Sequence, residues 1–329
     1  MTTLTDEHRS DFNVAGGSGS FGDILWRNHA GDYVLWLMNS NTPSTVATLP
    51  AVTPDWHLKA AADFDPFIGG NLNADILWQN DNGALALWQM NGTTVSAVHA
   101  LPNPGPTWHV VGDNDFNANG TDDIFFQHDN GALAIWTITS AAMPSISGMF
   151  AGTQNPGPTW HVVGSGDIDA DGRAGILWQN NNGALVLWEN PTLAAGTFTF
   201  NTVIPLPTVD PSWHVKGMAD LSGSVTADIV FQNDNGAVAI WEMGLGPGST
   251  NPILAMNLVN LGTDWGPAWH VVGLRDMNND ARADVLLQND NGAAAVWEDY
   301  TPYATGLATF LSFAITPSPN PNGHVWDLL

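Results

Sequence analysis

An internal repeat with a period of about 52 residues constrains this chain more than any other feature of its sequence. The segment DILWQNDNGALALWQM at 75–90 has relatives at 23–38, 123–138, 175–190, 228–243 and 284–299. Each copy carries a tryptophan near its end: Trp36, Trp88, Trp136, Trp188, Trp241 and Trp297. A second motif, WHVVG or a close relative, begins at Trp56, Trp108, Trp160, Trp213 and Trp269. We therefore expect a fold assembled from equivalent units.

Each unit reads as short β-strands separated by turns. In the second unit the apolar runs are WHLKA (56–60), ILWQN (76–80), ALALWQM (84–90) and the weaker TTVSAVHALP (93–102). The turn DNG (81–83) joins the second and third runs, and Asn-Gly between apolar runs is a strong hairpin signal because both residues tolerate positive φ. The pattern predicts a four-stranded antiparallel meander without helical periodicity.

A single meander cannot bury both of its faces, whereas several packed face to face around an axis can. The sequence therefore predicts an all-β fold, a six-bladed β-propeller of four-stranded antiparallel blades in one domain over 1–329. A β-solenoid requires much shorter repeats. The predicted repeats are approximately 11–55, 56–107, 108–159, 160–212, 213–268 and 269–322.

The two ends of the chain predict how the ring closes. The first unit begins at its Asp loop, without a WHVVG strand before it. The last residues, GHVWDLL at 323–329, resemble that missing strand and place His324 in the column of the other repeated histidines. We expect 323–329 to complete the first blade.

Charge and composition exclude several classes of partner. Lys+Arg number 7 against 32 Asp+Glu, a net charge of −25, which opposes binding to nucleic acid or to an anionic membrane. The chain has no cysteine, and no apolar run reaches the roughly 18 residues of a membrane span. The N-terminal MTTLTDEHRS lacks the pattern of a signal peptide. We expect an extracellular or cell-surface location, reached by another export route or as a piece of a longer protein.

The loop after WHVVG is rich in oxygen-bearing side chains at alternate positions. In the third unit, DFNANGTDD places them at positions one, three, five and nine, with Gly120 at six, an arrangement that suits calcium. The candidate ligands are Asp115, Asn117, Asn119 and Asp123 in the third unit, Asp276, Asn278, Asp280 and Asp284 in the sixth, Asp167, Asp169 and Asp171 in the fourth, and Asp63, Asp65, Asn71 and Asp75 in the second. In the fourth unit Gly175 occupies position nine, so a ligand must come from elsewhere.

Two alternatives compete with calcium in these loops. An EF-hand requires Glu at position twelve and flanking helices, and here Phe126, Trp178 or Leu287 stands at that position. The other alternative is that Asp, Asn and Gly only form turns and cap backbone groups. The first and fifth units carry poorer sets: Asp11, Asn13 and Asp23, and Asp220, Ser222, Ser224 and Asp228.

The unit DFNANGTDDIFFQHDNGALAIW and its relatives resemble the FG-GAP or VCBS-type repeats of integrin α-chain propellers, bacterial secreted proteins and some propeller lectins. The resemblance covers nearly the whole chain. It implies calcium in the loop between the first and second strands, matching Asp115, Asn117, Asn119 and Asp123, and a bacterial source. Because such repeats serve enzymes, adhesins and lectins alike, it does not decide the function.

Aromatic and amide side chains are the candidate ligand-binding residues. Tryptophans of the second strand, Trp26, Trp78 and Trp178, either offer flat faces for a sugar or belong to an adaptable core, because this position varies between units. The strictly repeated third-strand tryptophans are expected to fill wedges between blades. The candidate polar partners are Gln79, Gln127, Gln179, Gln232 and Gln288, and a hydrogen bond that fixes the hairpin is an equal explanation for them. The repeated histidines are expected to be structural, because one active site needs unique residues.

Three function classes remain. The favoured one is a noncatalytic, calcium-stabilised recognition module that binds neutral glycans through repeated sites, because weak equivalent sites on one body gain by avidity. The first alternative is an enzyme with a single site at the channel mouth, using pattern-breaking residues among Arg27, Arg173, Arg275 and Lys59. The second is a purely structural or protein-interaction scaffold. The sequence contains no HExxH, GxSxG, P-loop or GxGxxG motif in the strand or helix context that its chemistry needs.

Overall fold

The computed structural model describes residues 22–28, 31–39, 42–64, 73–139, 144–169, 171–224, 226–243, 257–260, 266–298, 311–315 and 326–328. Every regular element among them is a β-strand. The described part of the chain contains no apolar helix of membrane-spanning length. The expected all-β class is therefore confirmed for these residues.

Strands occur where the repeats predict them. The first strands, which carry the WHVVG motif, are β4 (Trp56–Ala62), β8 (Trp108–Asn114), β12 (Trp160–Gly166), β16 (Trp213–Ala219) and β20 (Trp269–Arg275). The second strands are β1 (Ile24–Asn28), β5 (Asp75–Asn80), β9 (Asp123–His128), β13 (Gly175–Asn180), β17 (Asp228–Asn233) and β21 (Asp284–Asn289). The third strands are β2 (Tyr33–Asn39), β6 (Leu85–Asn91), β10 (Leu133–Ile138), β14 (Leu185–Ala194), β18 (Val238–Glu242) and β22 (Ala294–Glu298). The fourth strands are β3 (Thr42–Thr48), β7 (Thr94–Leu101), β11 (Ile146–Gly152), β15 (Thr197–Leu206), β19 (Asn257–Asn260) and β23 (Leu311–Ala314), and β24 (Trp326–Leu328) follows.

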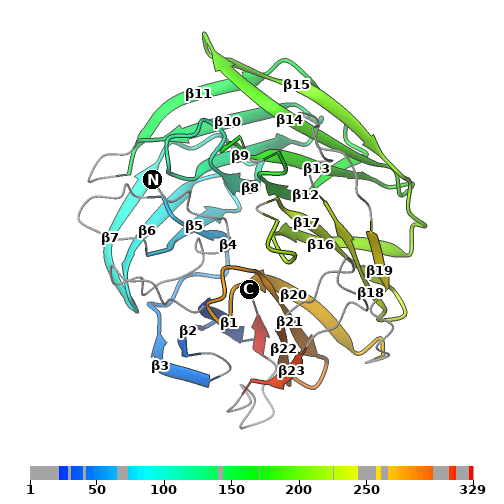
Figure 1. Cartoon of the computed structure of the whole chain (residues 1–329). Helices are drawn as coiled ribbons and strands as arrows, with labels where there is room; N and C mark the ends of the chain where they lie inside the picture. The colour runs from blue at the N-terminus through cyan, green and yellow to red at the C-terminus, as the bar shows by residue number, and fades with distance from the viewer. Residues whose placement is uncertain are drawn as a thin grey trace.

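Antiparallel meanders form a ring, with the first strands nearest its centre and the fourth strands at its periphery (Figure 1). Consecutive first strands contact each other around this centre. These features are those of a β-propeller. One departure from separate blades is an eight-stranded sheet, in which β11 of unit three pairs in parallel with β15 of unit four. The strands β14 and β15 are ten residues long, and this extra length carries β15 to the edge of its neighbour.

The C-terminal strand β24 pairs with β1, as the sequence predicts. The register joins Trp26 to Leu328, Arg27 to Asp327 and Asn28 to Trp326 in an antiparallel ladder. The remainder of the predicted closing segment, 323–325 with His324, and Leu329, lies outside the described residues. The first sheet is thus built from both ends of the chain, in the order β24-β1-β2-β3.

Hydrophobic clusters lie between consecutive units. The cluster between units three and four contains Phe125 and Ile176 together with Trp178 and Trp188. Another cluster contains Ile24, Trp26, Leu286 and Val296, and it joins the sheet of unit six to that of unit one. The third-strand tryptophans are all buried within these clusters or against them, with exposed fractions of 2% to 9%. The expectation that they fill wedges between sheets is confirmed.

The hairpin between the second and third strands differs from the expected turn in one respect. In unit two, Gly83 N donates to Asn80 O at 2.8 Å and Asn80 N donates to Ala84 O at 2.8 Å. Gly83 has φ +88°, whereas Asn82 is not among the residues with positive φ. The loop is therefore a type I turn closed by a left-handed glycine, and only one of its residues needs positive φ. A Cβ on Gly83 would lie 2.2 Å from the backbone of Gly105, so glycine is also required sterically.

Candidate functional site

The position-nine aspartates are buried and tie the Asp loop to the neighbouring strands. Asp123 accepts hydrogen bonds from Phe116 N at 3.2 Å, Ile138 N at 3.0 Å and Asn117 Nδ2 at 3.0 Å. The equivalent bonds in other units are Met38 N to Asp23 at 2.7 Å, Met90 N to Asp75 at 2.8 Å, Met243 N to Asp228 at 2.8 Å and Met277 N to Asp284 at 2.8 Å. These carboxylates are structural parts of the loop whether or not a cation binds.

The position-one aspartates cap backbone groups of the same loop. Asp115 accepts from Gly120 N at 2.7 Å and from Asn117 N and Asn119 N at 3.2 Å. In unit six, Asp276 accepts from the backbone of Asn279, Asp280 and Ala281 at 2.6, 3.2 and 2.9 Å. The turn-capping interpretation therefore applies to both loops, and calcium coordination in them stays a prediction.

The structure brings the predicted ligands of each loop together to different extents. The sets of units three and six each lie on one loop, as the capping bonds require. In unit two only Asp63 and Asp75 can be placed, because Asp65 and Asn71 lie outside the described residues, as do Asp11 and Asn13 of unit one. The Asp loops also join neighbouring units: Asp122 N donates to Asp63 O at 2.8 Å, and Gly22 N donates to Asp276 O at 2.5 Å across the closure.

The loop of unit four holds the one close group of three carboxylates found among the described residues. Carboxylate oxygens of Asp167, Asp169 and Asp171 all lie within 4.8 Å of one another. Glu189, on β14, is buried beside this loop with an exposed fraction of 1%. Burial, and then the charges of the three aspartates, raise the pKa of Glu189 to about 9. Several oxygen ligands in one place fit a hard cation such as calcium, which takes six to eight of them.

Glu189 is not among the metal ligands that the sequence pattern predicts. Its signal is a glutamate directly after the third-strand Trp188 in the unit that lacks the position-nine aspartate. The signal is not specific, because Glu242 and Glu298 follow the equivalent tryptophans in units that keep that aspartate. Glu298 also lies near the position-nine Asp284 of its own unit, so Glu189 is distinguished by the glycine that stands at position nine of its loop.

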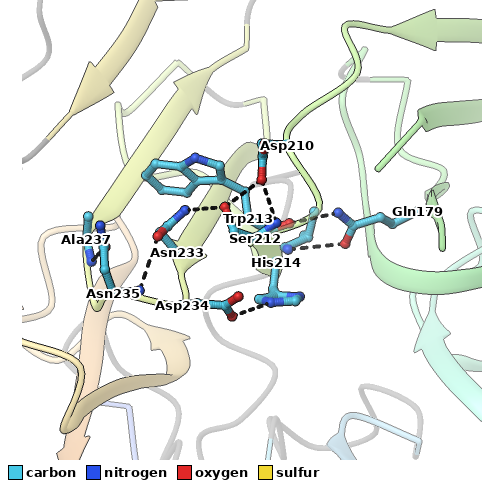
Figure 2. A network of polar contacts seen from close by, with 10 residues as sticks. Gln179, Asp210, Ser212, Trp213, His214, Asn233, Asp234, Asn235 and Ala237 are labelled. Atoms are coloured by element: carbon cyan, nitrogen blue, oxygen red, sulfur yellow. Dashed lines mark hydrogen bonds and ion pairs between the residues drawn. The ribbon is translucent and has the colours of Figure 1, made fainter. Parts of the chain in front are cut away.

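At the opposite ends of the strands, the repeated glutamines bridge neighbouring units (Figure 2). Gln179 donates to the backbone oxygen of Trp213 at 3.0 Å and accepts from Val215 N at 3.4 Å. Equivalent bonds to the next unit are Gln79 to Trp108 O at 2.7 Å, Gln127 to Trp160 O at 3.0 Å and Gln232 to Trp269 O at 2.7 Å. The fifth candidate, Gln288, is buried. These hydrogen bonds join two units and do not fix a hairpin within one unit. They occupy the glutamine side-chain amides that the sequence suggests as ligand-binding groups.

Replacing Gln232 by leucine should destabilise the fold by about 2 kcal/mol, because the buried Val271 N–H loses its acceptor and the oxygen of Trp269 its donor. Urea unfolding measures the change. Gln127→Leu is the matched control, since Gln127 makes only the bond to Trp160 O, and it should cost less. An equal loss in both variants would contradict the bridging role.

The repeated histidines bond the hairpin turn of their own unit. His214 Nε2 lies 2.8 Å from Asp234 Oδ1 (Figure 2). His214 is on β16, next to Trp213, whose backbone oxygen accepts the bond from Gln179. The other pairs are His57 with Asp81, His109 with Asp129, His161 with Asn181 and His270 with Asp290, at 2.7 to 2.8 Å. The structural interpretation of this column is confirmed for the described histidines.

The second-strand tryptophans do not offer faces to solvent. Trp26, Trp78 and Trp178 each have an exposed fraction of 1%. Trp78 packs edge-on against Tyr33 of unit one at a centroid distance of 4.9 Å. The expectation that these tryptophans stack on a sugar is therefore wrong, because the neighbouring unit covers them.

Arg275 belongs to the closure of the ring. It is partly buried, and its Nη1 donates to the backbone oxygen of Asp23 at 2.5 Å. Burial lowers the pKa of Arg275 to about 10, and the Asp23 carboxylate opposes that shift. These contacts place Arg275 between units six and one, where it bonds the backbone of the first unit.

A cleft of about 240 Å³ opens between units four and five, on the side of the glutamine bridges. It is lined by His161, Val163, Gln179, Asn180, Asn181, Gly183, Pro211 and His214. None of these residues carries a carboxylate. Asn181 stands where Asp81, Asp129, Asp234 and Asp290 stand in the other described hairpin turns. The lining side chains can donate and accept hydrogen bonds and none is itself charged at neutral pH apart from what a protonated histidine would carry.

Comparison with known proteins gives structural neighbours only. No family model matches the chain, and no curated protein matches its sequence. Among solved structures, one described as the crystal structure of a mitotic checkpoint complex aligns with a TM-score of 0.46 and 11% identity, covering 96% of this chain and 82% of that one. The structure of the Dos1 propeller aligns with a TM-score of 0.42 and 11% identity, covering 90% of this chain and 69% of that one.

Proposed function

We propose that the chain is a noncatalytic recognition module: a six-bladed propeller of the FG-GAP or VCBS type that binds neutral glycans in clefts between its blades and calcium in its Asp loops. The observation that carries the proposal is the carboxylate-free polar cleft between units four and five. The proposal includes one domain over 1–329, a bacterial source and an extracellular or cell-surface location, where calcium reaches the concentrations that weak loop sites need.

The chemistry of the cleft suits a sugar. The side chains of His161, Asn181 and His214 present hydrogen-bonding groups, as sugar hydroxyls require, while Pro211 supplies an apolar wall. The lining residues carry no carboxylate of their own, and the carboxylate of Asp234 is bonded to His214. The net charge of −25 opposes sulfated or sialylated sugars.

Affinity at a single cleft should be low. A small, open cleft that binds one neutral sugar is expected near the millimolar end, about −4 kcal/mol. Attachment to a surface with many glycans should be much tighter, because the proposal places further sites between the other units, which carry an aspartate where this cleft has Asn181, and sites on one rigid body bind together. The proposed repetition of the units supplies that multiplicity.

A glycan array, run with and without calcium and followed by calorimetry with the simple sugars it identifies, tests the proposal. We expect binding to neutral glycans, and Asn181→Asp and His214→Ala should weaken binding at the cleft at least about tenfold through lost bonds and added charge. Asp129→Asn, at the same turn position of unit three, is the matched control and should leave this cleft unchanged. Blank results on the array and in calorimetry at saturating calcium would overturn glycan binding and favour the scaffold.

A further inference from the structure

Unit four differs from the other units at two positions that meet in space. Gly175 replaces the position-nine aspartate, and Glu189 follows Trp188 on the adjacent strand β14. A Cβ built on Gly175 would lie 2.0 Å from Glu189 Oε1 and 2.2 Å from its Oε2. The carboxylate of Glu189 therefore occupies the place from which an aspartate at 175 would reach the loop.

The two kinds of carboxylate differ in their hydrogen bonds. In unit five, Asp228 accepts from Leu221 N at 3.0 Å, Ser222 N at 2.9 Å and Met243 N at 2.8 Å. In unit four, Glu189 Oε1 is buried without a hydrogen-bond partner. A buried carboxylate without donors is costly unless a cation compensates it.

The backbone of unit four is also rearranged at this point. Asn190 stands where Met38, Met90, Ile138 and Met243 donate their N–H groups to the position-nine aspartate. It has φ +58°, and its Nδ2 donates to Asp169 Oδ2 at 3.3 Å. At Asn190, in the middle of β14, the strand departs from a regular ladder, and the Asn190 side chain bonds the loop.

We propose that Glu189 is a cation ligand, which with Asp167, Asp169 and Asp171 forms the strongest calcium site of the chain. The inference rests on the proposed calcium binding and adds which loop binds most tightly and through which residue. In unit five, N–H donors satisfy the buried position-nine carboxylate, whereas unit four places three clustered carboxylates beside Glu189, whose buried Oε1 lacks a donor. Such a set favours calcium over magnesium, which demands a small octahedral shell and keeps its waters.

Calcium titration by calorimetry, with melting curves in chelator and in calcium, tests the assignment. We expect one site much tighter than any other, and Glu189→Gln should weaken it about tenfold or more, since ligand charge sets calcium affinity. The same variant should gain less melting temperature from calcium than the native chain, because glutamine supplies no negative charge to the ion. A merely structural glutamate would change the melting temperature by the same amount in chelator and in calcium.

Two further variants complete the experiment. Glu242→Gln, at the equivalent position of unit five, is the matched control and should leave the tight site unchanged. Gly175→Asp combined with Glu189→Ala should restore binding, because it returns the carboxylate to the position that the other units use.

Three results would overturn the assignment. If calcium binds but Glu189→Gln keeps the same Kd, the ligand assignment is wrong. If Glu242→Gln weakens binding equally, the site is not in unit four. If calcium does not bind at all, the calcium part of the proposed function fails with it, while glycan binding is judged separately by the array.

Discussion

Removal of residues 323–329 should open the ring and cost about 3 kcal/mol or more of folding free energy, in the range of the largest single-site losses. The strand β24 is the hydrogen-bonding partner of β1 on the central side of the first sheet. Without it, the polar backbone groups of β1 face solvent and offer an edge for association with other chains. Urea unfolding and light scattering measure the two effects.

Two point variants separate the backbone ladder from the loss of side chains. Asp327→Pro removes an N–H within β24 and should reproduce much of the effect, because Asp327 pairs with Arg27 in the ladder. Asp327→Ala keeps the backbone and should be close to neutral. A truncated protein that remained monomeric and equally stable would show that β24 does not hold the ring closed.

Replacing Trp178 by alanine should destabilise the fold by about 3 to 5 kcal/mol, the usual cost of emptying a large aromatic site. Trp178 lies between units three and four, 5.1 Å from the ring of Trp188 and 6.1 Å from that of Phe125. Both neighbours are buried, so the cavity cannot fill by a simple side-chain rotation. Chemical denaturation gives the loss directly.

Trp178→Phe is the control for this prediction and should cost much less. Phe126 and Phe231 occupy the equivalent position in units three and five, and the indole Nε1 of Trp178 has no hydrogen-bond partner to lose. If Trp178→Ala instead kept its stability and lost glycan binding, the tryptophan would act at a ligand site after all. That result would contradict the conclusion that burial keeps Trp178 away from a ligand.

The strands and their order were predictable because the signals are local. Apolar runs, the DNG turn and the Asp loop recur in each unit, so even a weak preference becomes clear by repetition. The pairing of β24 with β1 was predictable for the same reason, since the segment at 323–329 resembles the strand that unit one lacks. The positions of the described Asp loops were predicted as well; the ligands named for them stay a prediction, and Glu189 was not among them.

The faces of the second strand were not predictable. In β13, Ile176, Leu177 and Trp178 are consecutive and all buried, because sheets of neighbouring units cover both faces. A strand that is apolar on both sides has no alternation to show which residues face a ligand. The expectation that Trp178 exposes a face to a ligand was therefore wrong. The sequence does not show that neighbouring units cover both faces of this strand.

The polar contacts also required the tertiary structure. Gln79 reaches Trp108, 29 residues away in the next unit, rather than its own hairpin. Glu189 reaches the place of an aspartate missing at Gly175, and only the packing of β14 against the loop brings the two positions together. The repeat by itself determined the strands and the positions of the turns, which depend on neighbours along the chain, and it indicated the closure through the likeness of 323–329 to the missing first strand. Which side chains are covered, bridged or left without a donor was decided by the packing of one unit against the next.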